Sequence, residues 1–244
     1  MNLMSVNKKL YLIGIGPGSP KYVLEIAKDT IMKSNYIIGY EYTLKNISQF
    51  INKEFQEVYQ ITMNDQEGIY TKVFNKMKEG EVCTVPFTGD VNFSESEVVD
   101  RLLEMFGEDN VELIAGISSI QVAASKAKIA LDKSIVISFH VTEDIEERKR
   151  DLLNAVKDGR NVILLPRPWN NNPVKEFMQS DIAIYLRNNG IKTSELDVWV
   201  FEFLTTTNEK IFKGKLNELE NMKFDPLSVL VIDRVQRKSY MAFN

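Results

Sequence analysis

YLIGIGPGSP, residues 11–20, joins an apolar run to a segment of three glycines and two prolines. A dinucleotide-binding fingerprint needs glycines at its first, third and sixth positions, but the sixth position here is Ser19, and Pro17 removes a backbone donor. The acidic residue that such a site places about 20 residues later is missing from KSNYII, and the loop lacks the G-K-[ST] of a phosphate-binding loop. The segment therefore forms either a tight strand-to-helix turn or a rigid ledge that a flat ligand can approach closely.

Outward from this loop, apolar runs of strand length alternate with helical patterns. Strands are expected at 9–15, 35–40, 81–87, 111–116, 134–140, 161–168, 195–204, 209–216 and 227–233. Helices are expected at 21–34, 64–80, 94–107, 118–130, 145–159 and 172–190. The pairs Ser94–Glu97 and Ser118–Gln121 have the spacing of capping boxes. The alternation predicts an α/β fold with largely parallel sheets, and 195–204 with 209–216 predicts a hairpin.

The weakest point of this alternation is the segment AGISS, residues 115–119. We therefore expect two α/β domains, an N-terminal domain of residues 1–115 and a C-terminal domain of residues 116–244. A chain of 244 residues is long enough for one large domain or two small ones.

Composition excludes several classes of protein. One cysteine, Cys83, rules out a disulfide framework and a cysteine-rich zinc site, and one histidine, His140, rules out a multi-histidine metal site. The net charge of −4 and the mixed charges of ERKRD, residues 147–151, argue against nucleic-acid binding. Apolar runs stay well short of the roughly 18 residues of a membrane span, and MNLMSVNKK does not match a signal peptide. We expect a cytoplasmic protein without a metal or a membrane partner.

The order of several motifs resembles the tetrapyrrole methylase superfamily, whose members use S-adenosylmethionine. IGIGPGSP at 13–20 is similar to its opening motif, TGD at 88–90 to its Gly-Asp motif, and AGISSIQ at 115–121 to its Pro-Gly-x-Ser-Ser motif. VILLPRP at 162–168 resembles the strand that ends beside the adenosine. The resemblance spans roughly residues 8–233 and implies two α/β domains with a cofactor cleft between them.

One subfamily is especially similar, the cobalt-precorrin-7 C-5 methyltransferases, which also form the N-terminal half of the fused precorrin-6Y methylase. SFH at 138–140 resembles its Ser-x-His motif, and VFEFL at 200–204 followed by Glu209 resembles its Glu-x-Leu…Glu-Lys hairpin. The resemblance implies methyl transfer to a ring carbon of a cobalt-precorrin in cobalamin biosynthesis. Such a reaction needs positioning rather than a protein nucleophile, because the sulfonium is already activated.

The resemblance also assigns residues to the site. The cofactor contacts that it implies are Pro17, Gly89, Asp90, Phe93, Ser118, Ser119, Ile120, Leu165 and Pro166. The substrate contacts are Gly16, Gly18 and Arg167, whose guanidinium can pair with a carboxylate bidentately. Asp90 is alternatively a turn aspartate, and Ser118 a helix N-cap. His140 is a candidate base or a structural residue.

Three departures from the family pattern keep alternatives open. Val91 stands where a proline is usual, Ala115 precedes Gly116 in place of a proline, and Val141-Thr142 replaces a Gly-Arg pair. The alternatives are a diphthine synthase-like protein methylase of the same fold and a non-catalytic binding relative. The failed fingerprint disfavours a nicotinamide-dependent oxidoreductase.

The resemblance further implies a homodimer. Apolar residues after the strand at 35–40 are candidates for its interface. They are Tyr40, Tyr42, Leu44, Ile47 and Phe50. Alternatively, these residues cover the N-terminal sheet.

Overall fold

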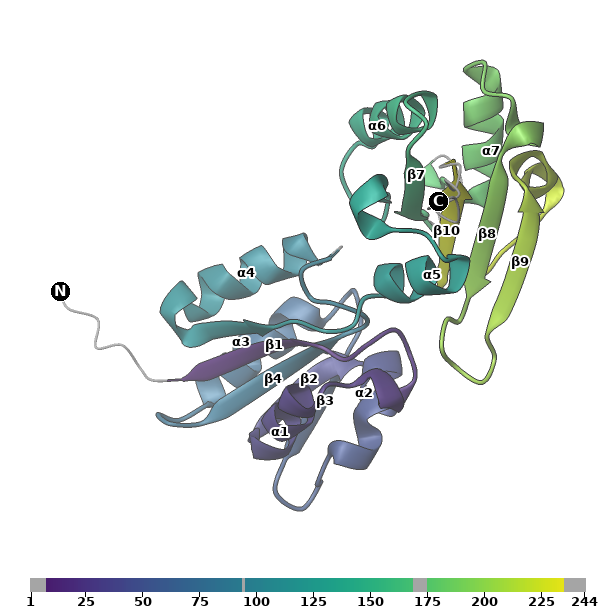
Figure 1. Cartoon of the computed structure of the whole chain (residues 1–244). Coiled ribbons are helices and arrows are strands. Elements are labelled where there is room, and N and C mark those ends of the chain that lie inside the picture. Colours follow the sequence, from purple (N-terminus) through teal and green to yellow (C-terminus); the bar gives the residue numbers. More distant parts are fainter. Residues whose placement is uncertain (1–7, 94, 169–174, 235–244) are drawn as a thin grey trace, which may run out of the picture. The chain divides into compact units, whose positions relative to one another are not determined.

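The computed structural model describes residues 8–93, 95–168 and 175–234. The chain divides into two units, Met1–Ser119 and Ile120–Asn244. This boundary lies four residues after the one expected from the sequence, between residues 115 and 116. Each unit is built on one five-stranded sheet with helices packed against it (Figure 1). The α/β fold class is thus confirmed.

All neighbouring strands of the first unit's sheet run parallel, in the order β3-β2-β4-β1-β5. Its strands are β1 (Lys9–Gly14), β2 (Tyr36–Tyr40), β3 (Glu57–Ile61), β4 (Val82–Phe87) and β5 (Val111–Ile114). Its helices are α1 (Glu25–Lys33), α2 (Glu41–Ile47), α3 (Gln66–Lys76) and α4 (Ser96–Phe106). Short 3-10 turns occupy Pro20–Tyr22, Ser48–Phe50 and Glu108–Asn110.

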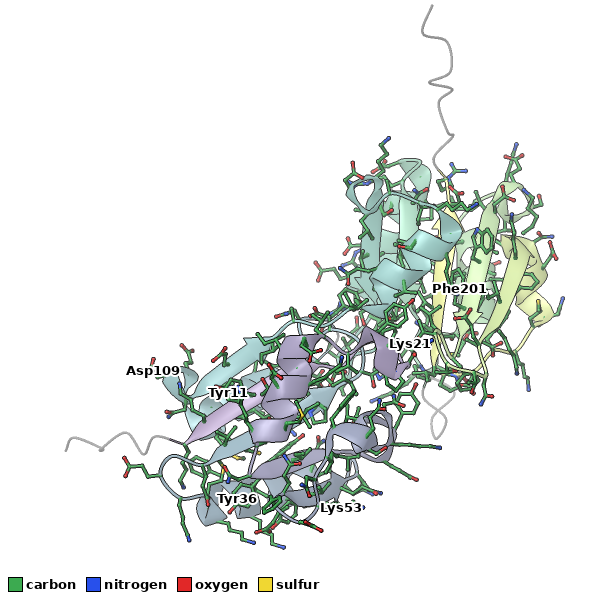
Figure 2. The ribbon with its side chains drawn as sticks, turned by 60° about the horizontal axis from the view of Figure 1, so that its bottom comes forward. Tyr11, Lys21, Tyr36, Lys53, Asp109 and Phe201 are labelled. Carbon is green, nitrogen blue, oxygen red and sulfur yellow. The ribbon has the colours of Figure 1, made fainter. Side chains whose placement is uncertain are left out.

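Both faces of this sheet are buried, which explains why its central strands are continuously apolar. Along β1, Leu10 and Leu12 enter the core beneath α3 and α4, whereas Ile13 belongs to the core beneath α1 and α2. Tyr11, labelled in Figure 2, lies between Leu10 and Leu12 in the sequence; it is partly buried and packs against the core beneath α1 and α2. The opening apolar run is therefore the middle of a two-sided core.

Two elements of this unit, α2 and β3, were not predicted from the sequence. β3 is an edge strand, and most of its side chains are exposed or half-buried, so EVYQI gives a weak apolar signal. Within and beside α2, Ile47 is fully buried, and Leu44 and Phe50 pack against the same core. These residues cover the sheet, as the alternative interpretation expected, and the dimer interface stays a prediction.

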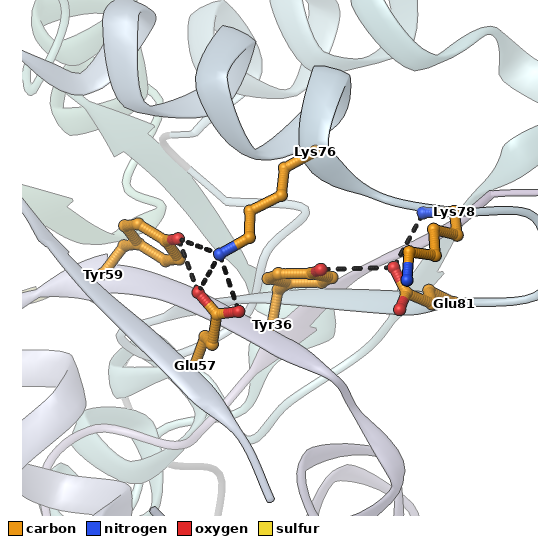
Figure 3. A network of polar contacts seen from close by, with 6 residues as sticks. All are labelled: Tyr36, Glu57, Tyr59, Lys76, Lys78 and Glu81. Carbon is orange, nitrogen blue, oxygen red and sulfur yellow. Dashed lines mark hydrogen bonds and ion pairs between the residues drawn. The ribbon is translucent and has the colours of Figure 1, made fainter.

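The amino edge of the same sheet carries a network of polar side chains (Figure 3). Lys76, at the end of α3, reaches both carboxylate oxygens of Glu57 at 2.7 and 2.6 Å, and Tyr59 donates to the same carboxylate at 2.7 Å. Tyr36 donates to Glu81 at 3.2 Å. The hydrogen bond from Lys76 is the largest cause of the lowered pKa of Glu57. Side chains at this edge therefore join the start of β3 to the end of α3.

The second unit has a mixed sheet in the order β6-β7-β10-β8-β9, in which β6 and β7 are parallel and the other neighbours antiparallel. Its strands are β6 (Ser134–Ser138), β7 (Asn161–Leu165), β8 (Asp197–Glu202), β9 (Lys210–Lys215) and β10 (Ser228–Asp233). Its helices are α5 (Ser119–Ala127, whose first residue closes the first unit), α6 (Glu146–Lys157) and α7 (Gln179–Asn188). The β8–β9 hairpin is confirmed, and Phe201 of β8, labelled in Figure 2, is fully buried. The expectation of a largely parallel sheet is wrong here, because three of the four pairings are antiparallel, and of these only β8–β9 is a hairpin.

Each expected helix begins later than its sequence pattern predicts, and α7 shows the largest difference. The segment expected as a helix from residue 172 contains Phe177, whose backbone pairs with Arg167, and α7 starts only at Gln179. The Asp181 carboxylate fixes this start by accepting a hydrogen bond from the Met178 N–H at 2.9 Å. α4 has Glu95 as its N-cap residue, and Ser94, the first residue of the expected capping box, lies outside the described residues. In the part of the chain that the structure describes, no helix is long and apolar enough to cross a membrane.

Candidate functional site

The carboxyl ends of β4, β1 and β5 lie side by side in the first unit, and the loops that follow them meet there. Carboxyl ends of parallel strands are where ligands bind in α/β sheets. Gly16 and Gly89 exchange two backbone hydrogen bonds, of 3.1 and 2.8 Å, so the loops after β1 and β4 are joined directly. Both glycines have positive φ angles, +81° and +75°, which other residues rarely adopt.

The third loop, after β5, packs onto these two through glycine backbone. A Cβ atom on Gly14 would lie 2.6 Å from both the Gly116 nitrogen and the Gly89 carbonyl oxygen. A Cβ atom on Gly116 would overlap the Gly89 carbonyl oxygen and lie 2.6 Å from the Gly14 carbonyl carbon. At these positions the absence of side chains lets three backbone segments touch one another. Besides the roles that the tight-turn and ledge interpretations give it, the loop therefore packs against the other two loops.

Asp90 holds this cluster of glycines with both carboxylate oxygens. One oxygen accepts the Gly116 N–H at 3.0 Å, and the other accepts the Asn92 N–H at 2.7 Å and the Asn92 side-chain amide at 2.9 Å. Asp90 is thus a turn aspartate that also reaches across to the loop after β5. Asn92 was not predicted as a site residue; it is bonded because an aspartate side chain commonly accepts the N–H two residues on.

The remaining predicted residues of the first unit lie around this cluster. Pro17 and Gly18 are buried, and the Phe93 N–H donates to the Asp90 carbonyl at 3.1 Å. A Cβ atom on Gly89 would lie 3.7 Å from the Ser119 nitrogen, which places the start of α5 beside the loop after β4. Ser118, which is buried, immediately precedes this helix, and Ile120 is its second residue. The structure therefore brings together most of the predicted cofactor residues of this unit, which ends at Ser119.

Glu95, the N-cap residue of α4, is a titratable group that was not predicted from the sequence. Burial raises the pKa of the Glu95 carboxyl to about 7. Burial also raises the pKa of Tyr40 at the end of β2, and the charge of Glu95 is the second cause of that shift. A glutamate at the start of a helix is usually exposed to solvent, so the sequence did not indicate that Glu95 is partly buried.

In the second unit, Leu165, Pro166 and Arg167 follow the end of β7. The Leu165 carbonyl accepts the Phe139 N–H at 2.9 Å, which extends the β6–β7 pairing. Arg167 is 5% exposed, and its guanidinium donates to the Thr142 carbonyl at 3.1 Å. It lines a pocket of about 330 Å³. The other lining residues are Thr142, Glu143, Asp144, Ile145, Glu146, Lys149, Lys175 and Glu176.

His140 follows the end of β6, and its side chain is exposed. Its backbone N–H donates to the Ser138 hydroxyl at 3.2 Å. Despite this exposure, the protein atoms around the imidazole lower its pKa by desolvation. The lowered pKa favours the neutral form, which can accept a proton. Near His140, Arg148 donates to the Ser138 carbonyl at 3.1 Å and to Glu143 at 2.7 Å.

Comparisons with known proteins agree with this arrangement. The family model described as Tetrapyrrole (Corrin/Porphyrin) Methylases matches residues 9–220. A probable cobalt-precorrin-7 C(5)-methyltransferase of Methanocaldococcus jannaschii is 32% identical over 225 residues, covering 92% of this chain and 97% of the relative. A cobalt-precorrin-4 C(11)-methyltransferase of the same organism is 25% identical over 99% of this chain and 93% of that protein.

Among solved structures, the precorrin-6Y methylase CbiE of Archaeoglobus fulgidus has a TM-score of 0.62 at 20% sequence identity, covering 93% of this chain and 99% of its own. The cobalt precorrin-4 methyltransferase CbiF has a TM-score of 0.72 at 18% identity, with coverages of 94% and 95%. At such identities the likeness shows the fold.

Proposed function

The chain belongs to the family of tetrapyrrole (corrin/porphyrin) methylases, and we propose that it transfers a methyl group from S-adenosylmethionine to a ring carbon of cobalt-precorrin-7. The observation that carries the choice of substrate is the 32% identity to the M. jannaschii relative, which extends over nearly the full length of both chains. The relative identified as a cobalt-precorrin-4 methylase is less similar, at 25%. The proposed position of methylation is therefore carbon 5.

The residues of the glycine cluster fit S-adenosylmethionine in their chemistry. Segments 14–18, 88–93 and 116–120 contain one carboxylate and not one lysine or arginine. A nucleotide phosphate would need basic residues or a row of free backbone donors, and Pro17 removes one donor. S-adenosylmethionine has no phosphate and carries positive charge on its sulfonium and ammonium groups. A site with backbone polar groups, serine hydroxyls and one carboxylate suits such a ligand.

The chain's own contribution to the reaction is positioning. S-adenosylmethionine supplies an activated methyl group when it is bound. We propose that Pro17, Gly89, Asp90 and Phe93 hold it together with Ser118, Ser119, Ile120, Leu165 and Pro166. The start of α5 presents backbone N–H groups, which suit the methionine carboxylate. Two of the three loops are joined by backbone hydrogen bonds, and the third is joined to them by the Asp90 carboxylate. This arrangement holds the site rigidly, and rigid alignment is what an in-line displacement requires.

Gly16, Gly18 and Arg167 are our proposed substrate contacts, and His140 is the proposed proton acceptor. The carboxylate side chains of a cobalt-precorrin need cationic partners, and Arg167 lines a pocket. Val91, which replaces the usual proline after Gly-Asp, is buried in the core of the first unit. This substitution exchanges one apolar residue for another, so it does not favour a non-catalytic relative.

We further propose that the protein works as a homodimer in the cytoplasm. Light scattering at micromolar concentration tests the assembly: we expect twice the chain mass of 28.0 kDa. A scattering mass equal to that of one chain would contradict the dimer.

Calorimetric titration tests the proposed cofactor. We expect S-adenosylhomocysteine, the reaction product, to bind with a Kd in the micromolar range or below, and NAD and ATP to bind at least about a hundredfold more weakly, a difference of about 2.7 kcal/mol. Binding of NAD or ATP without binding of S-adenosylhomocysteine would contradict the proposal.

A further inference from the structure

The turn that connects β8 to β9 has an unusual backbone. Phe203 and Thr205 have φ angles of +49° and +69°, in the left-handed region that glycine normally occupies. Neither residue is glycine, and Thr205 is β-branched, for which this region is a genuine outlier. Such conformations persist where the surrounding structure enforces them, and they concentrate at functional sites.

The Glu209 side chain is a contact that enforces this turn. One of its carboxylate oxygens accepts the Thr205 N–H at 2.6 Å. The Thr206 hydroxyl adds local support by donating to the Phe203 carbonyl at 2.8 Å and accepting the Asn208 N–H at 3.2 Å. Thr205 therefore donates its N–H to the Glu209 carboxylate at the other end of the same turn. Hydrogen bonds to a charged acceptor are stronger than those between neutral groups.

The second oxygen of Glu209 bonds to a different element. It lies 2.7 Å from the Lys126 ammonium, and the two side chains are only 19% and 34% exposed. Lys126 belongs to the last turn of α5, the helix that begins at Ser119. The same helix carries Ala123, Ala124 and Ala127, all buried. One carboxylate thus joins the strained turn to the helix whose first residues we assign to the cofactor.

We infer that Glu209 is a positioning residue for methyl transfer: it holds the strained β8–β9 turn against α5 and so fixes the start of that helix at the cofactor site. This inference rests on the proposed function, because only a ligand at the start of α5 would sense the displacement. The helix is nine residues long and rigid, so a shift at Lys126 is transmitted to Ser119 and Ile120.

The experiment measures S-adenosylhomocysteine affinity by calorimetry and amide hydrogen exchange of residues 203–209 and α5, in the full chain. Glu209→Ala should speed exchange of the Thr205 amide and weaken S-adenosylhomocysteine binding about tenfold. Glu209→Gln keeps one oxygen acceptor but loses the ion pair, so we expect an intermediate affinity. Adding Thr205→Gly to Glu209→Ala relieves the strain of the turn, because glycine adopts this φ angle without help, but it does not restore the bond to Lys126, so we expect the affinity to stay low.

Glu218→Ala is the matched control. Glu218 also accepts a backbone N–H, from Lys215 at 2.7 Å, but it belongs to the turn after β9 rather than to the β8–β9 turn. Its loss should leave S-adenosylhomocysteine affinity unchanged.

The outcomes separate the two claims. Equal losses of affinity in Glu209→Ala and Glu218→Ala would mean general destabilisation and would overturn the positioning role. Unchanged affinity in Glu209→Ala, with faster exchange, would also overturn it. Failure of the wild-type chain to bind S-adenosylhomocysteine would instead overturn the proposed function, whatever the exchange data show.

Discussion

Two regions of the molecule hold backbone in the left-handed conformation, and they do so in different ways. In the glycine cluster of the first unit, Gly16 and Gly89 adopt positive φ angles that glycine tolerates without strain. In the β8–β9 turn of the second unit, Phe203 and Thr205 adopt similar angles against their intrinsic preference. Each region also depends on one carboxylate that accepts backbone N–H groups, Asp90 in the first and Glu209 in the second.

The difference has a physical consequence. In the glycine cluster the close packing of three loops depends on missing side chains, and Asp90 adds to a contact that the backbone already makes. In the β8–β9 turn the backbone would relax if its carboxylate were lost. Substitutions that add a side chain should therefore destabilise the glycine cluster most, whereas substitutions that remove the carboxylate should disturb the β8–β9 turn most.

Gly116→Ala should have the largest effect on the cluster. The new Cβ would overlap backbone atoms of Gly89 and Gly14 that cannot move aside easily, so we expect a loss of about 3 kcal/mol or more in the free energy of unfolding. Urea denaturation followed by circular dichroism measures it. Gly68→Ala is the control, since a Cβ there meets open space in α3, and it should stabilise the chain by up to about 1 kcal/mol. Similar effects for the two variants would contradict the packing role of Gly116.

Asp90→Ala should have the next largest effect. It removes the acceptors of three hydrogen bonds, and we expect a loss of about 2–3 kcal/mol in unfolding free energy together with weaker S-adenosylhomocysteine binding. Asp90→Asn keeps one oxygen and should lose roughly half as much. Asp29→Ala, at an exposed position of α1, should stay within about 0.5 kcal/mol of wild type. An Asp90→Ala variant as stable as Asp29→Ala would show that the carboxylate does not support the loops.

Glu95→Gln should have the smallest effect, and one that depends on pH. The pKa of Glu95 is raised to about 7, so between its ordinary value and pH 7 the folded chain keeps a proton that the unfolded chain has lost. Stability should therefore fall as pH rises through this window, and the glutamine variant should gain about 1–2 kcal/mol relative to wild type from pH 5 to pH 8. Glu104→Gln, on the exposed side of the same helix, is the control. A difference between Glu95→Gln and wild type that stays constant with pH would contradict the burial of this carboxyl.

The periodic elements and the family could be predicted from the sequence, because both depend on local patterns and on the order of short motifs. The family match confirms the resemblance drawn from residues 13–20, 88–90 and 115–121. The edge strand β3 was missed because an edge position permits polar side chains, as in EVYQI. The start of α7 was misplaced because Phe177 pairs with Arg167 rather than continuing the helical pattern.

The contacts that build the site could not be predicted, since they join residues far apart in the chain. Gly14 and Gly116 touch through backbone, and the sequence indicates each glycine without indicating its partner. The role of Glu209 was hidden for a further reason: Thr205 has an ordinary sequence context, and only its φ angle shows that it needs support.

Incubation of the purified chain with S-adenosylmethionine and cobalt-precorrin-7 tests the central claim most directly. Mass spectrometry of the tetrapyrrole, with a labelled methyl group and carbon NMR, reports both transfer and position. We predict a product one methyl group heavier, labelled at carbon 5, with one S-adenosylhomocysteine formed for each methyl transferred. Cobalt-precorrin-7 left unmodified by a chain that binds S-adenosylhomocysteine and methylates cobalt-precorrin-4 instead would contradict the account.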